Sequence, residues 1–334
     1  MKNIIKDARI LLTGGAGSVG RALTREMLEY SPKTIRIYDL SENEMFKMKC
    51  AFGENRKIRY LMGDIRDINR LKFAMEDIDF VIHLAAMKHV SACEYNPFEA
   101  IKTNIDGLQN VINVARDYNV RKMIFSSTDK AAHPTNVMGM TKLMGEKLIA
   151  LANYYKGNKR TRFASIRFGN VIGSNGSVIP LFKKQIADGG PITITDKGMT
   201  RFVITMEEAV NLICNALELS RGAETFAWKM RTVRVLDIAK AMIKEYSPEK
   251  TVRMVIKGKS EGEKLHEETM SDDELLRARE LDKMYVIFPE IDYLNIAANY
   301  RHAKEIKNPV IKSDMGRYMR ESEIRGLIKE RSEG

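Results

Sequence analysis

Hydrophobic and polar positions follow two alternating periods through the first half of this chain. Short apolar runs typical of β-strands are separated by longer stretches in which apolar residues recur every three or four positions, as in amphipathic helices. The expected strands are residues 9–12, 34–38, 59–62, 80–84, 122–126 and 163–167, and the expected helices are 21–30, 99–118 and 136–155. This alternation predicts the α/β class, with a Rossmann-type, doubly wound parallel sheet.

The second half shows the same two periods less regularly. Helix and strand patterns are expected within residues 182–195, 206–220, 235–246 and 252–256, and a more irregular, charged stretch follows Gly258. We therefore expect a large domain over residues 1–170 and a smaller C-terminal lobe over residues 171–334, with later segments returning to the large domain. The basic stretch from Arg317 to Arg331 is expected to be the solvated face of a helix.

A glycine-rich turn joins the first expected strand to the first helix. Residues 13–20 read Thr-Gly-Gly-Ala-Gly-Ser-Val-Gly, and Gly14, Gly17 and Gly20 allow a tight turn, close approach of a pyrophosphate and close packing of the helix. The free N–H groups at the start of that helix attract phosphate. Asp39 ends the second strand, where a carboxylate binds the adenosine ribose and repels a 2′-phosphate. Together they predict NAD as the cofactor, with NADP as the alternative.

Small or acidic residues also follow the next two strands. Asp64 and Ile65 come after the third strand, and Ala85 and Ala86 come after the fourth. Because the carboxyl ends of parallel strands meet at one edge of the sheet, we expect the first pair beside the adenine and the second beside the nicotinamide.

Eight further segments in a fixed order complete a known pattern. They are residues 86–90, 94–97, 102–104, 127–131, 167–171, 176–180, 199–202 and 262–267. With the glycine turn, they resemble the extended short-chain dehydrogenase/reductase superfamily and, within it, the UDP-N-acetylglucosamine 4,6-dehydratases of bacterial and archaeal polysaccharide and flagellin-sugar biosynthesis. The resemblance implies an enzyme that oxidises C4 of the sugar, eliminates water across C5 and C6 and returns the hydride to C6, which leaves a UDP-4-keto-6-deoxy-N-acetylhexosamine.

The resemblance also assigns roles to the two parts of the chain. Residues 1–170 are expected to bind NAD(P), and residues 171–334 are expected to bind the nucleotide sugar. The residues expected at the cofactor are Gly14, Gly17, Ser18, Val19, Gly20, Asp39, Asp64, Ile65, Ala85, Ala86, Lys88, Asn104, Ser126 and Lys142.

One position departs from the superfamily pattern. The Tyr-x-x-x-Lys motif reads Met-Gly-Met-Thr-Lys from Met138 to Lys142. A thioether cannot handle a proton usefully, whereas Lys142 can still bind the nicotinamide ribose. Some relatives of this kind also carry methionine here, so the replacement does not by itself imply an inactive enzyme. The chain has 20 methionines, and the alternative is that Met138 simply fills space.

The proton chemistry is then expected to fall on the preceding Thr-Asp-Lys triplet. Our hypothesis is that Asp129 is the acid toward the C6 hydroxyl, Lys130 is the base at C5, and Thr128 hydrogen-bonds the C4 oxygen. Lys130 would need a lowered pKa, which burial can supply although Asp129 acts against it. The expected catalytic residues are Thr128, Asp129, Lys130, Met138 and Lys142.

Substrate contacts are expected mainly from the second half. The resemblance places Asn170 at the substrate phosphate or sugar, Arg201 at the pyrophosphate, which a guanidinium can bind with paired donors, and Glu263 at the uridine ribose. The residues expected at the substrate are Lys88, His89, Asn170, Ser177, Val178, Arg201 and Glu263.

Two other functions fit parts of the pattern. A UDP-sugar 4-epimerase would share the fold, the cofactor and the oxidation at C4, but it needs no acid and base at C5 and C6. A non-catalytic protein that binds a nucleotide sugar or a dinucleotide is permitted by the loss of the tyrosine.

Composition narrows the partners. The formal charge is +11, but the basic residues are scattered and form no nucleic-acid-binding motif, so we expect no nucleic-acid partner and attribute the charge to attraction of phosphates. Three cysteines without metal-ligand spacing predict neither a disulfide framework nor a metal site, and they fit a reducing cytoplasm. No apolar run reaches the roughly 18 residues of a membrane span, and the start is not a signal peptide, so we expect no membrane partner.

The resemblance implies a homo-oligomer, either a dimer or a hexamer. The helices expected over residues 100–118 and 136–155 would form the usual dimer surface.

Overall fold

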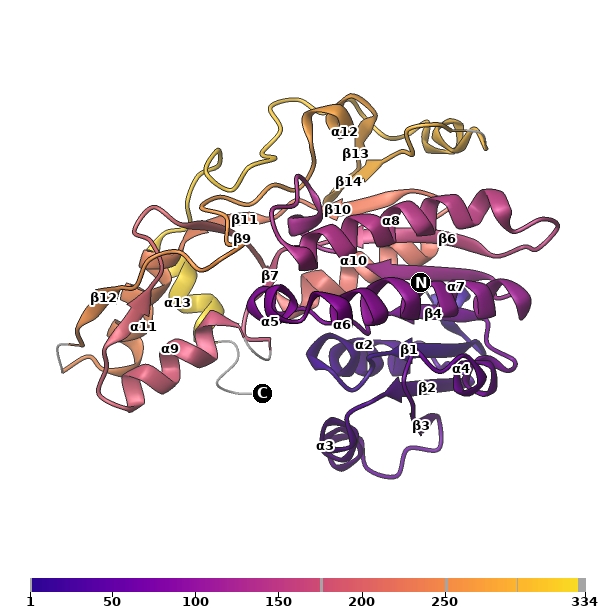
Figure 1. The fold of residues 1–334 in the computed structure, drawn as a ribbon, viewed down its shortest axis with the longest axis horizontal. Helices are drawn as coiled ribbons and strands as arrows, with labels where there is room; N and C mark the ends of the chain where they lie inside the picture. Colours follow the sequence, from indigo (N-terminus) through magenta and orange to yellow (C-terminus); the bar gives the residue numbers. More distant parts are fainter. Residues whose placement is uncertain (1, 175–176, 250–251, 293, 330–334) are drawn as a thin grey trace.

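A nine-stranded sheet forms the centre of the molecule (Figure 1). The computed structural model describes residues 2–174, 177–249, 252–292 and 294–329. In spatial order the strands are β13 (Ala278–Glu280), β14 (Met284–Ile287), β10 (Thr225–Trp228), β6 (Arg162–Arg167), β5 (Lys122–Ser126), β4 (Phe80–His83), β1 (Arg9–Thr13), β2 (Thr34–Asp39) and β3 (Ile58–Met62). Strands β1 to β6 and β10 pair in parallel, whereas β14 is antiparallel to both β10 and β13. The predicted α/β class and doubly wound sheet are confirmed.

Helices cover both faces of this sheet because its strands are apolar on both sides. In β1, Ile10 and Leu12 pack into the core under one face, and Leu11 packs into the core under the other. The first face is covered by α2 (Ser18–Glu29), α3 (Glu42–Phe52) and α10 (Met206–Leu219). The second face is covered by α4 (Ile68–Met75), α7 (Gly107–Asp117) and α8 (Val137–Tyr155).

The helix predicted over residues 99–118 is present, but a π-turn that was not predicted interrupts it. Short helices α5 (Val90–Tyr95) and α6 (Pro97–Ile101) come first, and a π-helical turn at Lys102–Asp106 then separates α6 from α7. A π-turn of this kind inserts an extra residue into the helix and re-aims the side chains around it. Here it directs Asn104 into the interior, where the side chain is only 3% exposed.

A smaller lobe lies beside the carboxyl edge of the sheet, on the left in Figure 1. Its strands are β7 (Asn170–Val171), β8 (Ile192–Ile194), β9 (Thr200–Ile204), β11 (Arg231–Arg234) and β12 (Met254–Ile256), and its helices are α9 (Val178–Ala187), α11 (Val235–Tyr246) and α13 (Glu321–Lys329). The remaining short elements are α1 (Lys2–Ile5), α12 (Asp272–Leu276) and 3₁₀ turns at Asp129–Ala131 and Ile296–Tyr300.

Where the structure describes it, the basic tail includes the amphipathic helix α13, whose charged side is the expected solvated face and whose other side is buried. Ile324 and Ile328 of α13 are buried in the core of the smaller lobe, against α9 and α11. The charged residues of α13 therefore occupy one side of an amphipathic helix whose other side is core. Arg331, at the end of the predicted basic stretch, lies outside the described residues.

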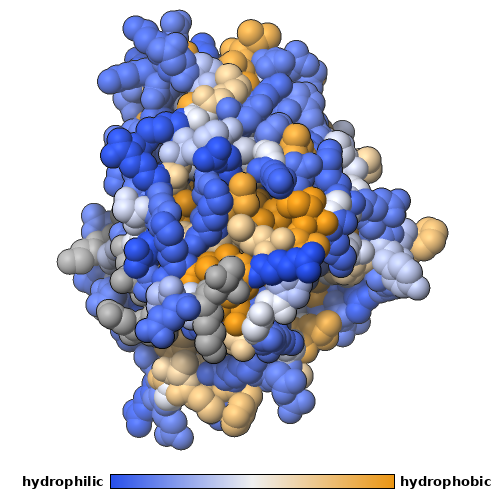
Figure 2. Space-filling view, turned by 90° about the vertical axis from the view of Figure 1, so that its left-hand side faces the viewer, coloured by the Kyte–Doolittle hydropathy of each residue, from blue (hydrophilic) through white to orange (hydrophobic). Residues whose placement is uncertain are grey.

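The molecular surface on the side of the smaller lobe is mostly hydrophilic, with an apolar area near its centre (Figure 2). Within the described ranges, no helix combines the length and the apolar character needed to cross a bilayer.

Candidate active site

The glycine turn closes tightly against the end of β4. Gly14 has a φ of +65°, and a Cβ at this position would lie 2.6 Å from the backbone nitrogen of Ala85. A Cβ on Gly17 would meet only the carbonyl oxygen of Gly14, at 3.3 Å, which leaves the side of the turn at Gly17 open to a ligand. The turn opens directly into α2, which begins at Ser18 without a side-chain cap, and the N-terminus of a helix attracts phosphate.

Asp39 lies beside this turn, as its sequence position predicts. One carboxylate oxygen accepts a hydrogen bond from the backbone N–H of Ala16 at 3.0 Å, and the other accepts from the backbone N–H of Ser41 at 3.0 Å. The carboxylate therefore has a fixed position at the end of β2, next to the glycine turn. The residues present fit the adenosine and pyrophosphate of a dinucleotide.

Several other residues expected at the cofactor contact neighbouring residues of the chain. Asp64 pairs with Arg66, whose hydrogen bond lowers the pKa of the Asp64 carboxyl, and Ile65 is buried against Gly107. The Asn104 amide exchanges hydrogen bonds with the backbone of Met87, at 2.8 and 3.0 Å, and donates to Thr141 Oγ1 at 3.0 Å. Asn104 thus ties the loop after β4 to α8 and fixes the wall of the cleft.

Lys142 projects from α8 toward the end of β5. Its ammonium donates to the carbonyl oxygen of Ser126 at 2.8 Å and lies 4.8 Å from the centre of the Phe125 ring. Burial lowers the pKa of Lys142 to about 8. On the loop after β4, burial also lowers the pKa values of Lys88 and His89.

The Thr-Asp-Lys triplet forms a short 3₁₀ turn directly after β5. Thr128 caps this turn by accepting from the backbone N–H of Lys130, and its hydroxyl donates to Asp129 Oδ1 at 2.9 Å. Lys130 Nζ lies 2.9 Å from the same oxygen, while Asp129 Oδ2 is buried without a hydrogen-bond partner in the described part of the chain. The triplet therefore places a hydroxyl, a carboxyl and an amine within one turn.

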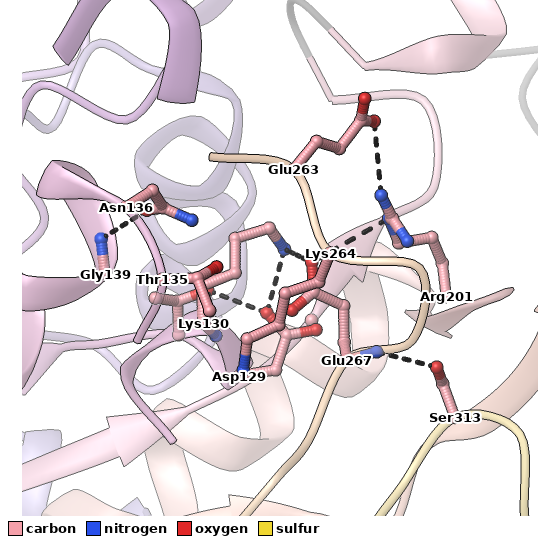
Figure 3. Close-up of polar contacts among 12 residues, drawn as sticks. Asp129, Lys130, Thr135, Asn136, Gly139, Arg201, Glu263, Lys264, Glu267 and Ser313 are labelled. Carbon is pink, nitrogen blue, oxygen red and sulfur yellow. Dashed lines mark hydrogen bonds and ion pairs between the residues drawn. The ribbon is translucent and has the colours of Figure 1, made fainter. Parts of the chain in front are cut away.

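A residue that sequence reasoning left out of the site completes this cluster (Figure 3). Glu267 is 2% exposed, and its Oε1 lies 3.5 Å from Lys130 Nζ and 3.9 Å from Arg201 Nε. Its position in the motif of residues 262–267 was the available signal, but the motif drew attention to Glu263 instead.

The lowered pKa expected for Lys130 is wrong for the ligand-free protein. Burial by itself lowers the pKa of this ammonium, but the carboxylates of Asp129 and Glu267 outweigh burial and raise it above the ordinary value. Lys130 is therefore a stable cation here, and it can act as a base only after its proton has moved.

Met138 occupies the first turn of α8 and is 4% exposed. It packs with Cys93 and Ala100, and Met87, Val90 and Val137 line the same small apolar cluster. Met138 therefore packs in an apolar cluster, as a space-filling methionine would.

The smaller lobe provides a pocket of about 170 Å³. Its lining includes five of the residues expected at the substrate, which are Asn170, Ser177, Val178, Arg201 and Glu263. Asn170 Oδ1 and Ser177 Oγ are buried and have no hydrogen-bond partner among the described residues, so both are available to a polar ligand. Arg201 Nη2 contacts Glu263 Oε1 at 3.2 Å. Lys88 and His89 do not line this pocket.

A mostly parallel sheet with this glycine turn and a lysine on α8 defines an extended short-chain dehydrogenase/reductase fold, which solved dehydratases and epimerases share. A model of the polysaccharide biosynthesis protein family matches residues 10–289, and the chain belongs to this family.

Relatives that are similar over most of this chain carry different names. A Campylobacter jejuni protein named UDP-N-acetylglucosamine 4,6-dehydratase (inverting) is 45% identical over 87% of this chain and 86% of its own. A Methanocaldococcus jannaschii protein named as an uncharacterized membrane protein is 47% identical over 86% of this chain and 88% of its own. A Rickettsia bellii protein named UDP-glucose 4-epimerase is 38% identical over 84% of this chain and 83% of its own.

The solved structure of Pen from Bacillus thuringiensis is 42% identical to this chain. The two superpose with a TM-score of 0.92, over 98% of this chain and 99% of Pen. The similarity therefore includes both lobes and the relation between them.

Proposed function

We propose that this protein is an NAD-dependent UDP-N-acetylglucosamine 4,6-dehydratase. The observation that carries the proposal is a chain of ionic contacts between the 3₁₀ turn that follows β5 and the pocket in the smaller lobe. The contacts run from Asp129 through Lys130, Glu267 and Arg201 to Glu263. An acid and an amine at one end, and a guanidinium at the other, suit a substrate that has both a sugar and a diphosphate. The 45% identity to a relative with this name supports the same conclusion.

The cofactor site proposed for NAD is formed by the glycine turn, Asp39 and Lys142. The turn and the start of α2 would hold the pyrophosphate, Asp39 the adenosine ribose, and Lys142 the nicotinamide ribose. When bound, NAD supplies a reversible acceptor for the hydrogen of C4 that is returned to C6. NADP binding should be weaker, because the Asp39 carboxylate would face the 2′-phosphate.

The protein's own residues would handle the protons. Thr128 holds Asp129 by a hydrogen bond, and its hydroxyl oxygen can accept a hydrogen bond from the C4 hydroxyl. Lys130, once neutral, takes the proton from C5, and Asp129 gives a proton to the C6 hydroxyl as it leaves as water. The site excludes bulk water, since Asp129 and Glu267 are almost fully buried.

We also propose that the protein is a homo-oligomer. Helix α8 exposes four large apolar side chains, those of Met140, Met144, Leu151 and Tyr155. Phe98 of α6 is 76% exposed. Burial of these residues against a second copy would remove apolar surface from water. Light scattering tests this proposal, and a monomer at micromolar concentration would contradict it.

The proposed activity is tested by proton NMR of the protein with UDP-N-acetylglucosamine and NAD in deuterated water. The expected result is a new C6 methyl signal with deuterium at C5, and the ring couplings give the configuration at C5 in the same spectrum. A UDP-N-acetylgalactosamine product without a methyl signal would identify a 4-epimerase instead. An unchanged spectrum, despite tight binding of NAD and UDP-sugar by calorimetry, would identify a binding protein.

A further inference from the structure

Glu267 is a buried carboxylate placed between two cations. Its side chain is 3% exposed, and its Oε1 faces Lys130 Nζ at 3.5 Å and Arg201 Nε at 3.9 Å. Its Oε2 is buried and makes no hydrogen bond within the described residues. A carboxylate is costly to bury unless other groups compensate its charge, so its position depends on these two cations.

The backbone around Glu267 is held firmly. Its N–H donates to Ser313 Oγ at 2.9 Å, and the N–H of Ser313 donates to the carbonyl oxygen of Glu267 at 2.9 Å. Two residues further on, the carbonyl oxygen of Thr269 accepts from Arg167 Nη1 at 3.1 Å, and Arg167 is itself buried between Glu146 and Glu274. These contacts fix the carboxylate in front of Lys130.

Three charged groups face the Lys130 ammonium, each from a different segment. Asp129 belongs to the same turn, Glu267 belongs to the segment of residues 262–267, and Arg201 belongs to β9. The two carboxylates raise the pKa of Lys130, and Arg201 lowers it. Asp129 and Lys130 therefore start with one proton between them, on the amine.

We propose that Glu267 is a positioning residue that keeps one shared proton on the Asp129–Lys130 pair. In the reaction, a Lys130 Nζ–H bond breaks and an O–H bond forms on Asp129, which turns the ion pair into a neutral amine and a carboxylic acid. The amine is then the base for C5, and the acid is the proton donor for the C6 hydroxyl. The negative charge of Glu267 disfavours loss of this proton to solvent as the pH rises.

This inference rests on the roles of Asp129 and Lys130 in the proposed dehydration. Loss of the shared proton would end the reaction at high pH. The alkaline fall of kcat/KM should therefore move to lower pH in Glu267→Gln. Glu268→Gln is the matched control, since Glu268 pairs with His133 and Lys312 rather than with Lys130 or Arg201.

A second measurement does not depend on turnover. The pH dependence of Lys130 acetylation by acetic anhydride, followed by peptide mass spectrometry, reports when the amine becomes neutral. Its midpoint should move to lower pH in Glu267→Gln and should stay at the wild-type value in Glu268→Gln. If Glu267→Gln does not fold by circular dichroism, Glu267→Met removes the same charge.

The outcomes separate the two proposals. Absence of any UDP-N-acetylglucosamine conversion by the wild-type protein would defeat the proposed function, whereas the acetylation midpoint would still test Glu267. An unchanged midpoint in the charge-removing variant, or an unchanged alkaline limb in an active one, would overturn the role of Glu267.

Discussion

Asn136 connects the two sides of the cleft through Gly262. Its Oδ1 accepts from the backbone N–H of Gly139 at 2.8 Å and caps α8, while its Nδ2 donates to the carbonyl oxygen of Gly262 at 2.9 Å. A Cβ on Gly262 would lie 2.8 Å from the Asn136 Cβ, so the segment that contains Glu263 and Glu267 packs directly on the start of α8. One side chain therefore both caps α8 and holds the segment around Gly262 against that helix.

Substitutions at Asn136 can separate its two contacts. Asn136→Asp keeps the cap and loses the donor to Gly262, so we expect little change in stability and a higher KM for the nucleotide sugar. Asn136→Ala loses both contacts and should also lower the free energy of unfolding by about 1 kcal/mol. Urea unfolding and steady-state kinetics check both values. An unchanged KM in Asn136→Asp would contradict a role for the Gly262 contact in binding.

The acid and base assignments predict losses at Lys130 and Asp129. Lys130→Ala and Asp129→Asn should each lower turnover by about 10²- to 10⁴-fold, the usual contribution of a positioned acid or base. Lys130→Ala should also abolish deuterium incorporation at C5. Lys47→Ala, which removes a lysine exposed on α3, is the control for loss of a positive charge. Near-normal turnover in either active-site variant would rule out its assigned role.

Met138 is expected to matter through packing alone. Met138→Leu preserves the apolar volume and should leave turnover within about threefold of wild type, since a thioether takes no part in proton transfer. Met138→Ala should lower the free energy of unfolding by about 2–5 kcal/mol, because it leaves a cavity in the cluster around Cys93. Kinetics and urea unfolding measure the two effects. A loss of turnover of 100-fold or more in folded Met138→Leu would show a more specific role.

The sequence predicted the sheet and the glycine turn well because these features depend on local pattern. All six expected strands appear within one residue of their predicted ends, since short apolar runs between helices have few other ways to be buried. The π-turn around Asn104 was not predictable in this way. The chain there has helical periodicity, and only the contacts of Asn104 with Met87 and Thr141 explain the extra residue in the turn.

In the candidate site, too, local motifs were predictable and contacts between distant residues were not. Asp129 and Lys130 were identified from a motif, and Arg201 and Glu263 do lie together in one pocket wall. The charge state of Lys130 required Glu267, which is 137 residues away in sequence and reaches the amine only in the folded chain. A pKa that depends on charged residues so far apart in sequence cannot be predicted from a local sequence pattern.

Lys142 provides a test of pH-dependent stability. Its pKa is lowered to about 8 by burial, from an ordinary value of 10.5, so between these pH values the unfolded chain binds a proton that the folded chain does not. Stability from this group therefore rises with pH across that window, by at most about 1.4 kcal/mol per pH unit. Lys142→Met should remove this contribution, and Lys147→Met is the control for an exposed lysine of the same helix. The free energy of unfolding of wild type minus that of Lys142→Met, measured in urea without ligand, should thus be more positive at pH 9.5 than at pH 7.5. If this value is the same at both pH values, the pKa of Lys142 is not lowered in the folded protein. Its buried position beside Ser126 would then need revision.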